Sequence, residues 1–177
     1  MISTLLSTST GDGSGASIDI ASNIDSTYDH YMFVLTGIHP ETDATYLGMQ
    51  FNASGESGYN ETITSAVLYT NSQEGSTDAT IDYATASLGN ETTYQRIGVS
   101  LGADNDQSAA GIFHLYNPAN TTYVTHFTGW MNADYEDNYM FCYHVAGYIN
   151  VTAAITGISF KFESGNINGT VQMYGIA

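Results

Sequence analysis

Short segments rich in aromatic and β-branched residues recur along this 177-residue chain, and clusters of Gly, Asn, Asp and Ser separate them. In one such segment Leu47, Met49 and Phe51 alternate with less apolar positions, a period of two that predicts a strand with one buried face. No long window carries a helical stripe, and the abundant Thr, Ser, Gly and Asn are poor residues for helix interiors. The pattern therefore predicts an all-β chain.

About eleven strands are expected, because each apolar segment ends at a cluster of turn-forming residues. They cover residues 2–6, 16–20, 28–38, 45–51, 63–70, 92–99, 111–117, 121–131, 139–149, 155–163 and 169–176. Many short strands at regular spacing predict an antiparallel β-sandwich, jelly-roll-like, that forms a single domain over residues 1–177. We expect residues 1–17 to be either a docking arm or a first hairpin.

The charge balance is strongly acidic, with 18 Asp and Glu against two basic residues, Arg96 and Lys161, and a formal net charge of -16. Two isolated cations do not make the basic surface with which proteins neutralise phosphates, so the sequence predicts no nucleic-acid binding. The same shortage disfavours anionic membrane surfaces. No stretch approaches the roughly 20 apolar residues of a membrane helix, so no membrane insertion is expected.

Cysteine use and the first residues bear on the compartment. Cys142 is the only cysteine, which excludes an internal disulfide, and its apolar surroundings predict a buried thiol rather than a reactive one. The opening residues, MISTLLSTST, lack the basic region and apolar core of a signal peptide. We therefore expect a protein made in a cytosol.

Sheet edges give a second expectation. Natural sheet proteins protect exposed edges with Lys, Pro or charges that point inward. This chain has only one Lys, Lys161, and two Pro, Pro40 and Pro118, in loop-like surroundings. Its aromatic residues, 14 Tyr, 7 Phe and one Trp, suit subunit interfaces. We expect partner subunits to cover the edges in a closed cyclic oligomer.

Two acidic stretches are candidate ligand sites, each with an ordinary alternative. Carboxylate and amide oxygens on a short turn suit calcium, which predicts a site at Asp104, Asn105 and Asp106, although solvated turn acids are the commoner case. Asp134, Glu136, Asp137 and Asn138 form a similar group. The loop 132–139 lies beside the only Trp. Sugars bind to exposed aromatic rings next to carboxylates and amides, so this loop also predicts glycan binding. The alternative is an ordinary polar loop beside a packed Trp. The predicted glycan-binding residues are Trp130, Asn132, Asp134, Tyr135, Asp137 and Tyr139.

Other chemistry has no signature. Four of the five histidines lie in expected strands without metal-binding spacing, which favours surface or core roles and leaves a zinc site built from separate strands open. These are His30, His114, His126 and His144. No nucleophile elbow, phosphate-binding loop, dinucleotide fingerprint or zinc-protease motif is present, so no catalytic residue and no cofactor other than calcium is predicted. A glycosidase needs only two carboxylates and stays a third alternative.

Three long segments, 28–55, 104–127 and 144–176, carry a resemblance to known proteins. With their strands and turns, from YDHYMFVLTGIHP to GTVQMYGI, they resemble a family of small β-sandwich proteins encoded by tailed phages, especially marine cyanophages. The resemblance spans nearly the whole chain but includes no catalytic motif.

The resemblance implies a non-enzymatic virion component, often trimeric, on the outside of the particle and assembled in the host cytoplasm. Its members are capsid decoration or head-fibre proteins, or tail-fibre and receptor-binding proteins. Because the first strands begin early in this chain, we favour a decoration or head-fibre protein that docks on phage capsid or tail proteins. A carbohydrate-binding module that recognises host surface glycans is the competing class.

Overall fold

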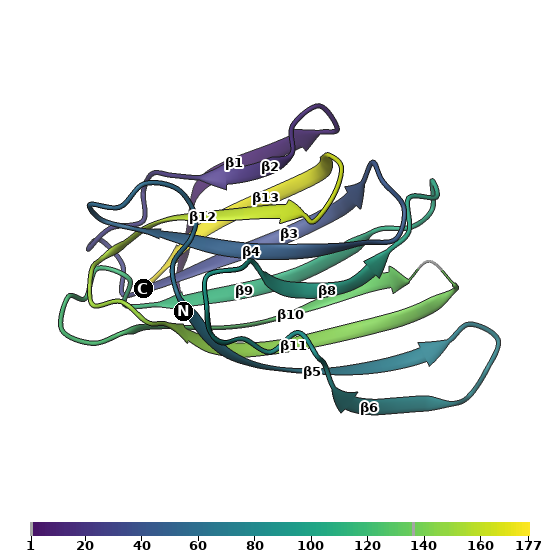
Figure 1. The fold of residues 1–177 in the computed structure, drawn as a ribbon. Coiled ribbons are helices and arrows are strands. Elements are labelled where there is room, and N and C mark those ends of the chain that lie inside the picture. The colour runs from purple at the N-terminus through teal and green to yellow at the C-terminus, as the bar shows by residue number, and fades with distance from the viewer. Residues whose placement is uncertain (1, 136) are drawn as a thin grey trace.

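The computed structural model describes residues 2–135 and 137–177, which form thirteen strands and no helix (Figure 1). None of these residues belongs to a helix long and apolar enough to cross a membrane. The strands are β1 (Ser3–Asp12), β2 (Ser17–Ile20), β3 (His30–Pro40), β4 (Thr45–Ala53), β5 (Ile63–Gln73), β6 (Ala79–Tyr83), β7 (Gly89–Glu91), β8 (Gln95–Leu101), β9 (Ala109–Tyr116), β10 (Thr125–Tyr135), β11 (Tyr139–Ile149), β12 (Ile155–Phe162) and β13 (Ile167–Ile176).

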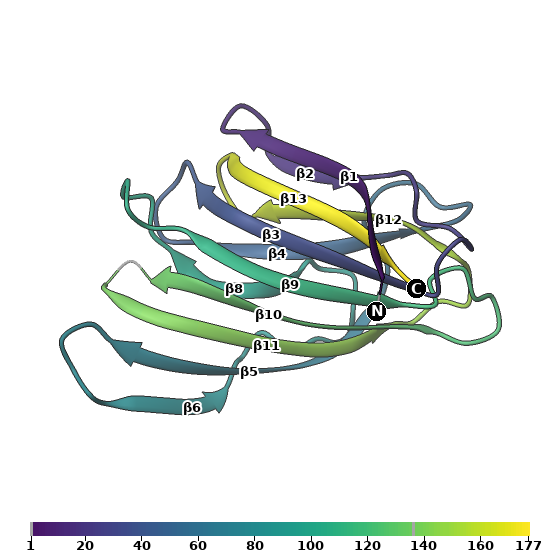
Figure 2. The same cartoon turned by 180° about the vertical axis from the view of Figure 1, so that it is seen from behind.

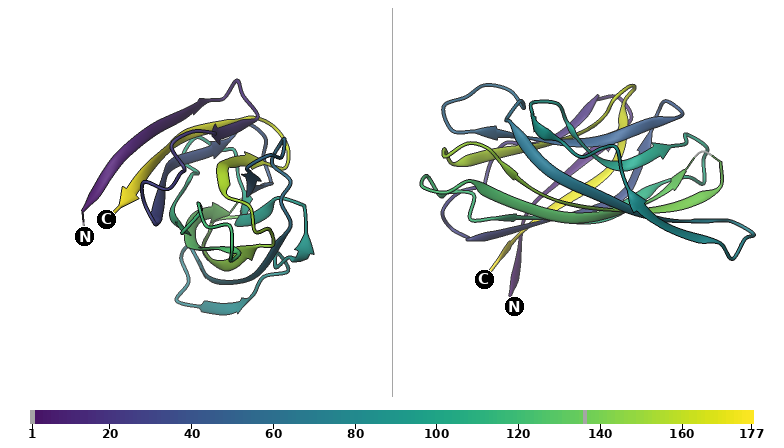
Figure 3. Two further views of the ribbon diagram at one scale, coloured as in Figure 1. Left: turned by 90° about the vertical axis from the view of Figure 1, so that its left-hand side faces the viewer. Right: turned by 60° about the horizontal axis from the view of Figure 1, so that its bottom comes forward.

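The strands pair antiparallel in two runs that one short contact joins. The long run follows the order β1-β13-β3-β9-β10-β11-β5-β6, with the short β7 also on β5 (Figure 2). The short run follows the order β8-β4-β12-β2 and is joined to β10 by the pairing of Leu101 with Tyr135. The result is one antiparallel sheet nearly closed into a barrel, seen end-on in Figure 3.

The core lies between the two runs, where the inward side chains of each meet. Phe33 and Phe113 of the long run contact Phe160 of β12, and Phe51 of β4 contacts Phe127 of β10. All five rings are almost completely buried. Each buried aromatic or aliphatic side chain of this size contributes about 1.5–3 kcal/mol, so the facing of the two runs is the main source of stability.

The strand count differs from the sequence expectation in one region. Each of the eleven expected segments overlaps an observed strand, and β6 and β7 are additional. Both additional strands are short, and every residue in them is exposed. Neither covers the core: β6 is a five-residue strand whose apolar residues are exposed, and β7 has only three residues and no apolar one. The chain is thus all-β as predicted, with thirteen strands.

The hairpin between β10 and β11 corrects a second expectation. Residues 132–139 were expected to form a loop, but Asn132 and Asp134 belong to β10, and Tyr135 pairs directly with Tyr139 of β11. The strands therefore extend to Tyr135 and from Tyr139, and residues 137–138 form part of the turn between them. Glu136, one of the predicted acidic ligands, lies outside the described residues.

The N-terminal segment is built into the sheet. Residues 1–17 were expected to form a docking arm or a first hairpin; in the structure β1 pairs with β13 and β2 pairs with β12. The strands β1 and β2 therefore do not form a hairpin with each other. Ile2 and Ala177 exchange two backbone hydrogen bonds, so the described chain ends lie side by side (Figure 2).

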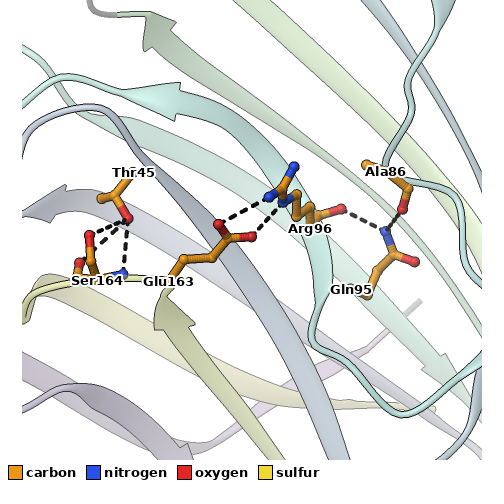
Figure 4. A network of polar contacts seen from close by, with 6 residues as sticks. All are labelled: Thr45, Ala86, Gln95, Arg96, Glu163 and Ser164. Carbon is orange, nitrogen blue, oxygen red and sulfur yellow. Dashed lines mark hydrogen bonds and ion pairs between the residues drawn. The ribbon is translucent and has the colours of Figure 1, made fainter.

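Both basic side chains lie on the short run. Arg96 of β8 donates to Glu163 through Nε at 2.5 Å and through a terminal nitrogen at 3.0 Å (Figure 4), and it lies 4.0 Å from the centre of the Tyr46 ring. These contacts raise the pKa of Arg96. Lys161 lies over the Tyr94 ring. Both cations therefore lie on strands of the short run and leave the long run without Lys or Arg.

Candidate functional site

A cavity of about 550 Å³ opens at the tip of the β10–β11 hairpin. It is bounded by the end of β5, the turn before β9 and the hairpin itself, which backbone hydrogen bonds tie together: Glu74 donates to Asn138, and Asp134 donates to Ser108. Its lining residues are Ser72, Gln73, Glu74, Asp104, Asp106, Gln107, Asp134, Tyr135, Asn138, Tyr139 and Met140. Four of these are carboxylates, so the cavity is strongly acidic.

Residues from both predicted ligand sites meet in this tip cavity. Asp104 and Asp106 come from the expected calcium turn, while Asp134, Tyr135 and Tyr139 come from the expected glycan loop. The Tyr135 and Tyr139 rings pack edge to face with centres 6.2 Å apart and form an aromatic wall beside the carboxylates. The sequence predicted the two groups separately, and the strand pairing brings them together.

The other predicted residues lie elsewhere. Asn105 lines a different cavity, with His39 and Glu41. Asp137 is exposed on the turn and does not line the tip cavity. Trp130 and Asn132 point away from the core on the outside of β10, where the Asn132 amide donates to the carbonyl of Phe141 at 3.4 Å. In the described part of the chain, no three His, Cys, Asp or Glu side chains are grouped as a metal ion would require.

The outside of the long run forms a second candidate surface, here called the outer face (Figure 2). It consists of the side chains that point away from the core, and the strand pairing arranges them in rows across the strands. The middle row contains Tyr83, Leu68, His144, Trp130, Ile112, Val34, Gln172 and Thr8. The next row contains Ala66, Ala146, Thr128, His114, Met32, Tyr174 and Leu5.

Two further rows complete the outer face. One contains Thr64, Tyr148, His126, Tyr116 and His30. The other contains Ile81, Thr70, Cys142, Asn132 and Ala110. No side chain in the four rows is Asp, Glu, Lys or Arg, although the chain has 18 acidic residues. Asp134 is the first carboxylate beyond them on β10, at the tip.

The outer face also collects exposed apolar side chains. Among the described residues nine large hydrophobic side chains are exposed, and seven of them lie here or in the adjoining row. These seven are Leu5, Leu68, Ile81, Tyr83, Tyr116, Trp130 and Met140. Around Trp130 the surface is hollowed into an apolar depression of about 400 Å³, with Tyr83 and His144 on its rim. An uncharged surface with a central Trp has the composition of a protein interface.

Four histidines, His30, His114, His126 and His144, point from the outer face, whereas His39, near the end of β3, lines the cavity that contains Asn105. The ring nitrogens His30 Nε2 and His114 Nδ1 lie 2.8 Å apart on neighbouring strands. The Tyr116 ring stacks on both imidazoles, with centres 4.9 Å from His30 and 6.2 Å from His114. Burial lowers the pKa of His30. Burial, and to a smaller extent the neighbouring His30, lowers the pKa of His114. Both rings are therefore neutral at pH 7.

Cys142 was expected to be buried in the core, but it lies at the surface of the sheet. Its side chain is only partly buried and points from the outer face, where Sγ lies 3.5 Å from His144 Nε2. Burial raises the pKa of the thiol, so the neutral form is favoured at pH 7. The apolar run around this residue misled the prediction, because β11 has the core on only one side.

No family model, no curated protein and no solved structure matches the chain.

The sequence alone did not predict the outer face as a functional surface. Its signal is visible in the alternation of the long strands: every second residue from Ala110 to Tyr116, and from His126 to Asn132, is uncharged on the side away from the core. The outward side of a strand that faces solvent is normally polar, and in this chain most of the polar side chains that could carry charge are acidic. The absence of charge from the outward positions is therefore the informative pattern.

Proposed function

We propose that the protein is a non-enzymatic structural subunit that assembles with further copies of itself through the outer face. The observation that carries the proposal is the absence of charged side chains from four rows of outward-pointing residues in a chain of net charge -16. Copies of such a chain repel one another wherever carboxylates face each other. The outer face is the surface on which that repulsion is smallest and the exposed apolar area is largest.

The strand edges support the same proposal. β1 and β6 end the long run, and neither contains the Lys or Pro with which natural edge strands are protected. β6 is exposed along its whole length and ends at Tyr83, which is 84% exposed, at the margin of the outer face. A second copy on the outer face would therefore also shield an edge. Three copies per assembly are proposed on the family resemblance.

We propose a place for this assembly on the exterior of a tailed-phage virion, as a capsid decoration or head-fibre protein assembled in the host cytoplasm. The resemblance of segments 28–55, 104–127 and 144–176 supports this role. Phage capsid or tail proteins would be the docking partners. Immunogold labelling of purified particles tests the location: gold on heads supports decoration, gold on tails supports a tail fibre, and unlabelled particles contradict both.

The fold is interpreted as an enlarged jelly-roll sandwich. In an eight-stranded jelly roll the first strand pairs with the eighth, the second with the seventh, the third with the sixth and the fourth with the fifth. The pairs β1–β13, β2–β12, β3–β9 and β4–β8 follow this scheme when β5–β7, β10 and β11 are treated as additions. Jelly rolls occur in viral capsid proteins and lectins, an analogy of fold alone.

Light scattering at neutral pH and seawater-like salt tests the assembly. A mass near three chains supports a trimer, and a single-chain mass at every concentration contradicts assembly. Thr128→Asp puts a carboxylate in the middle of the outer face and should lower the mass. Thr156→Asp, on β12 of the short run, is the matched control and should leave the mass unchanged.

Glycan binding at the tip cavity is the second candidate function, and it suits a receptor-binding protein or a carbohydrate-binding module. The observation in its favour is the aromatic wall of Tyr135 and Tyr139 beside the carboxylates. Tyr139→Ala should abolish binding to host-surface glycans on an array, while Tyr123→Ala should not. Repeating the array with calcium and with a chelator tests Asp104 and Asp106 as calcium ligands. Equal glycan signals from both variants would contradict this function.

A further inference from the structure

The pair His30 and His114 has the arrangement of two metal ligands. Each residue stands on a different strand, β3 or β9, and both side chains point from the outer face. Their facing nitrogens, Nε2 of His30 and Nδ1 of His114, are 2.8 Å apart. Two ligands at right angles around an ion, each about 2.0 Å from it, are separated by about 2.8 Å, whereas tetrahedral ligands are separated by about 3.3 Å.

The rings are also held in position. Tyr116 stacks on both imidazoles, and its hydroxyl lies 3.0 Å from Thr128 Oγ1 on β10. Contacts that fix the orientation of histidine rings raise metal affinity because less order is lost when the ion binds. Thus β3 and β9 supply the two nitrogens and the ring that orients them, and β10 supplies the hydroxyl that holds this ring.

The chemistry of the pair suits a metal as well. Both imidazoles are partly buried, and a neutral imidazole has one nitrogen with a free electron pair. In the metal-free pair one facing nitrogen is protonated and donates to the other. Moving that proton to the far nitrogen of the same ring frees both facing nitrogens, with no net proton release. A small rotation about each Cβ–Cγ bond, which keeps both rings stacked on Tyr116, then turns the two electron pairs toward a shared ion.

We propose that His30 and His114 form a site for a divalent late transition-metal ion with cis nitrogen ligands, namely Cu²⁺ or Ni²⁺. Right-angled coordination by nitrogen is typical of these two ions, and Cu²⁺ binds nitrogen sites most strongly in the divalent series. Water fills the remaining positions in a single chain. The site does not depend on assembly, although in an assembly through the outer face the ion would lie between copies.

Titration of the full chain with CuCl₂, NiCl₂ and ZnCl₂, each alone in a buffer that does not bind metals, tests the proposal. Calorimetry should give one strong Cu²⁺ per chain, weaker Ni²⁺ and the weakest binding for Zn²⁺. His30→Gln and His114→Gln should each weaken Cu²⁺ by at least about tenfold. The matched controls, His126→Gln on the same face and Cys142→Ser, should retain full affinity.

Measuring Cu²⁺ binding by the unaltered protein keeps the test valid if a variant misfolds. Substoichiometric Cu²⁺ should broaden the imidazole NMR signals of His30 and His114 before those of the other histidines, and electron paramagnetic resonance should show two nitrogen ligands. Broadening of His144 first, or loss of binding in Cys142→Ser, would assign the ion to the Cys142–His144 pair and overturn the proposal. Undetectable Cu²⁺ binding would overturn it as well. The readout is metal binding, so its failure is distinct from a failure of assembly.

Discussion

Replacing Trp130 by Ala should weaken self-association without unfolding the chain. Trp130 is 41% exposed in the middle of the outer face. A Trp side chain has about 250 Å² of surface, so a partner would cover about 100 Å² of it. At about 25 cal/mol per Å² this coverage is worth about 2.5 kcal/mol, of which Ala retains a small part. The expected loss of about 2 kcal/mol raises the dissociation constant about 30-fold.

Sedimentation equilibrium over a range of concentrations measures that constant. Tyr123→Ala is the matched control, because Tyr123 is 72% exposed but lies in the loop before β10, off the outer face. Thermal unfolding of both variants checks that the fold is intact. The reasoning is refuted if Trp130→Ala changes the dissociation constant by less than about threefold, or if Tyr123→Ala changes it as much.

Two further predictions concern stability. First, the folded chain should become less stable as the pH falls from 7.5 to 5.5, because the pKa values of His30 and His114 are lowered by burial. The unfolded chain binds protons at the ordinary histidine pKa of about 6.5, so stability is complete above that pH and declines below it; thermal unfolding across this range measures the decline. Second, Gly129→Ala should destabilise by about 1–3 kcal/mol in urea unfolding, because an added Cβ would lie 2.6 Å from the carbonyl oxygen of Ile112.

Each of these predictions has its own control. The double variant with His30→Gln and His114→Gln should lose most of the decline between pH 7.5 and 5.5, and an undiminished decline would assign it to other groups. For the glycine, the control is Gly89→Ala on β7, where no atom lies within 4 Å of an added Cβ. Equal destabilisation by both glycine variants would mean that crowding at Gly129 is not the cause.

The strand positions were largely predictable from local pattern. Leu47, Met49 and Phe51 alternate on β4, and all three side chains are buried, as expected from the period of two. β6 was not predicted, although Ala79, Ile81 and Tyr83 alternate in its sequence, because it is five residues long, packs on no core and pairs only with β5. Its strand conformation depends on the neighbouring strand rather than on its own composition.

The candidate sites were only partly predictable, since they depend on pairing between distant segments. Asp104 lies in the turn before β9 and Asp134 near the end of β10, and only the pairing of β8, β9 and β10 brings them to one cavity. Trp130 was grouped with Asp134 because they are close in sequence, yet it lies in a separate depression. The pair His30 and His114 is 84 residues apart in sequence, so no local spacing rule detects it.

Trp130 is the only tryptophan, so its fluorescence reports directly on coverage of the outer face. The decisive measurement is acrylamide quenching of this emission as the protein concentration is raised through the assembly range found by light scattering. Assembly through the outer face predicts that quenching decreases and the emission maximum moves to shorter wavelength as the mass increases. Constant quenching and an unchanged maximum, while the mass increases, would contradict the account and assign the interface to another surface.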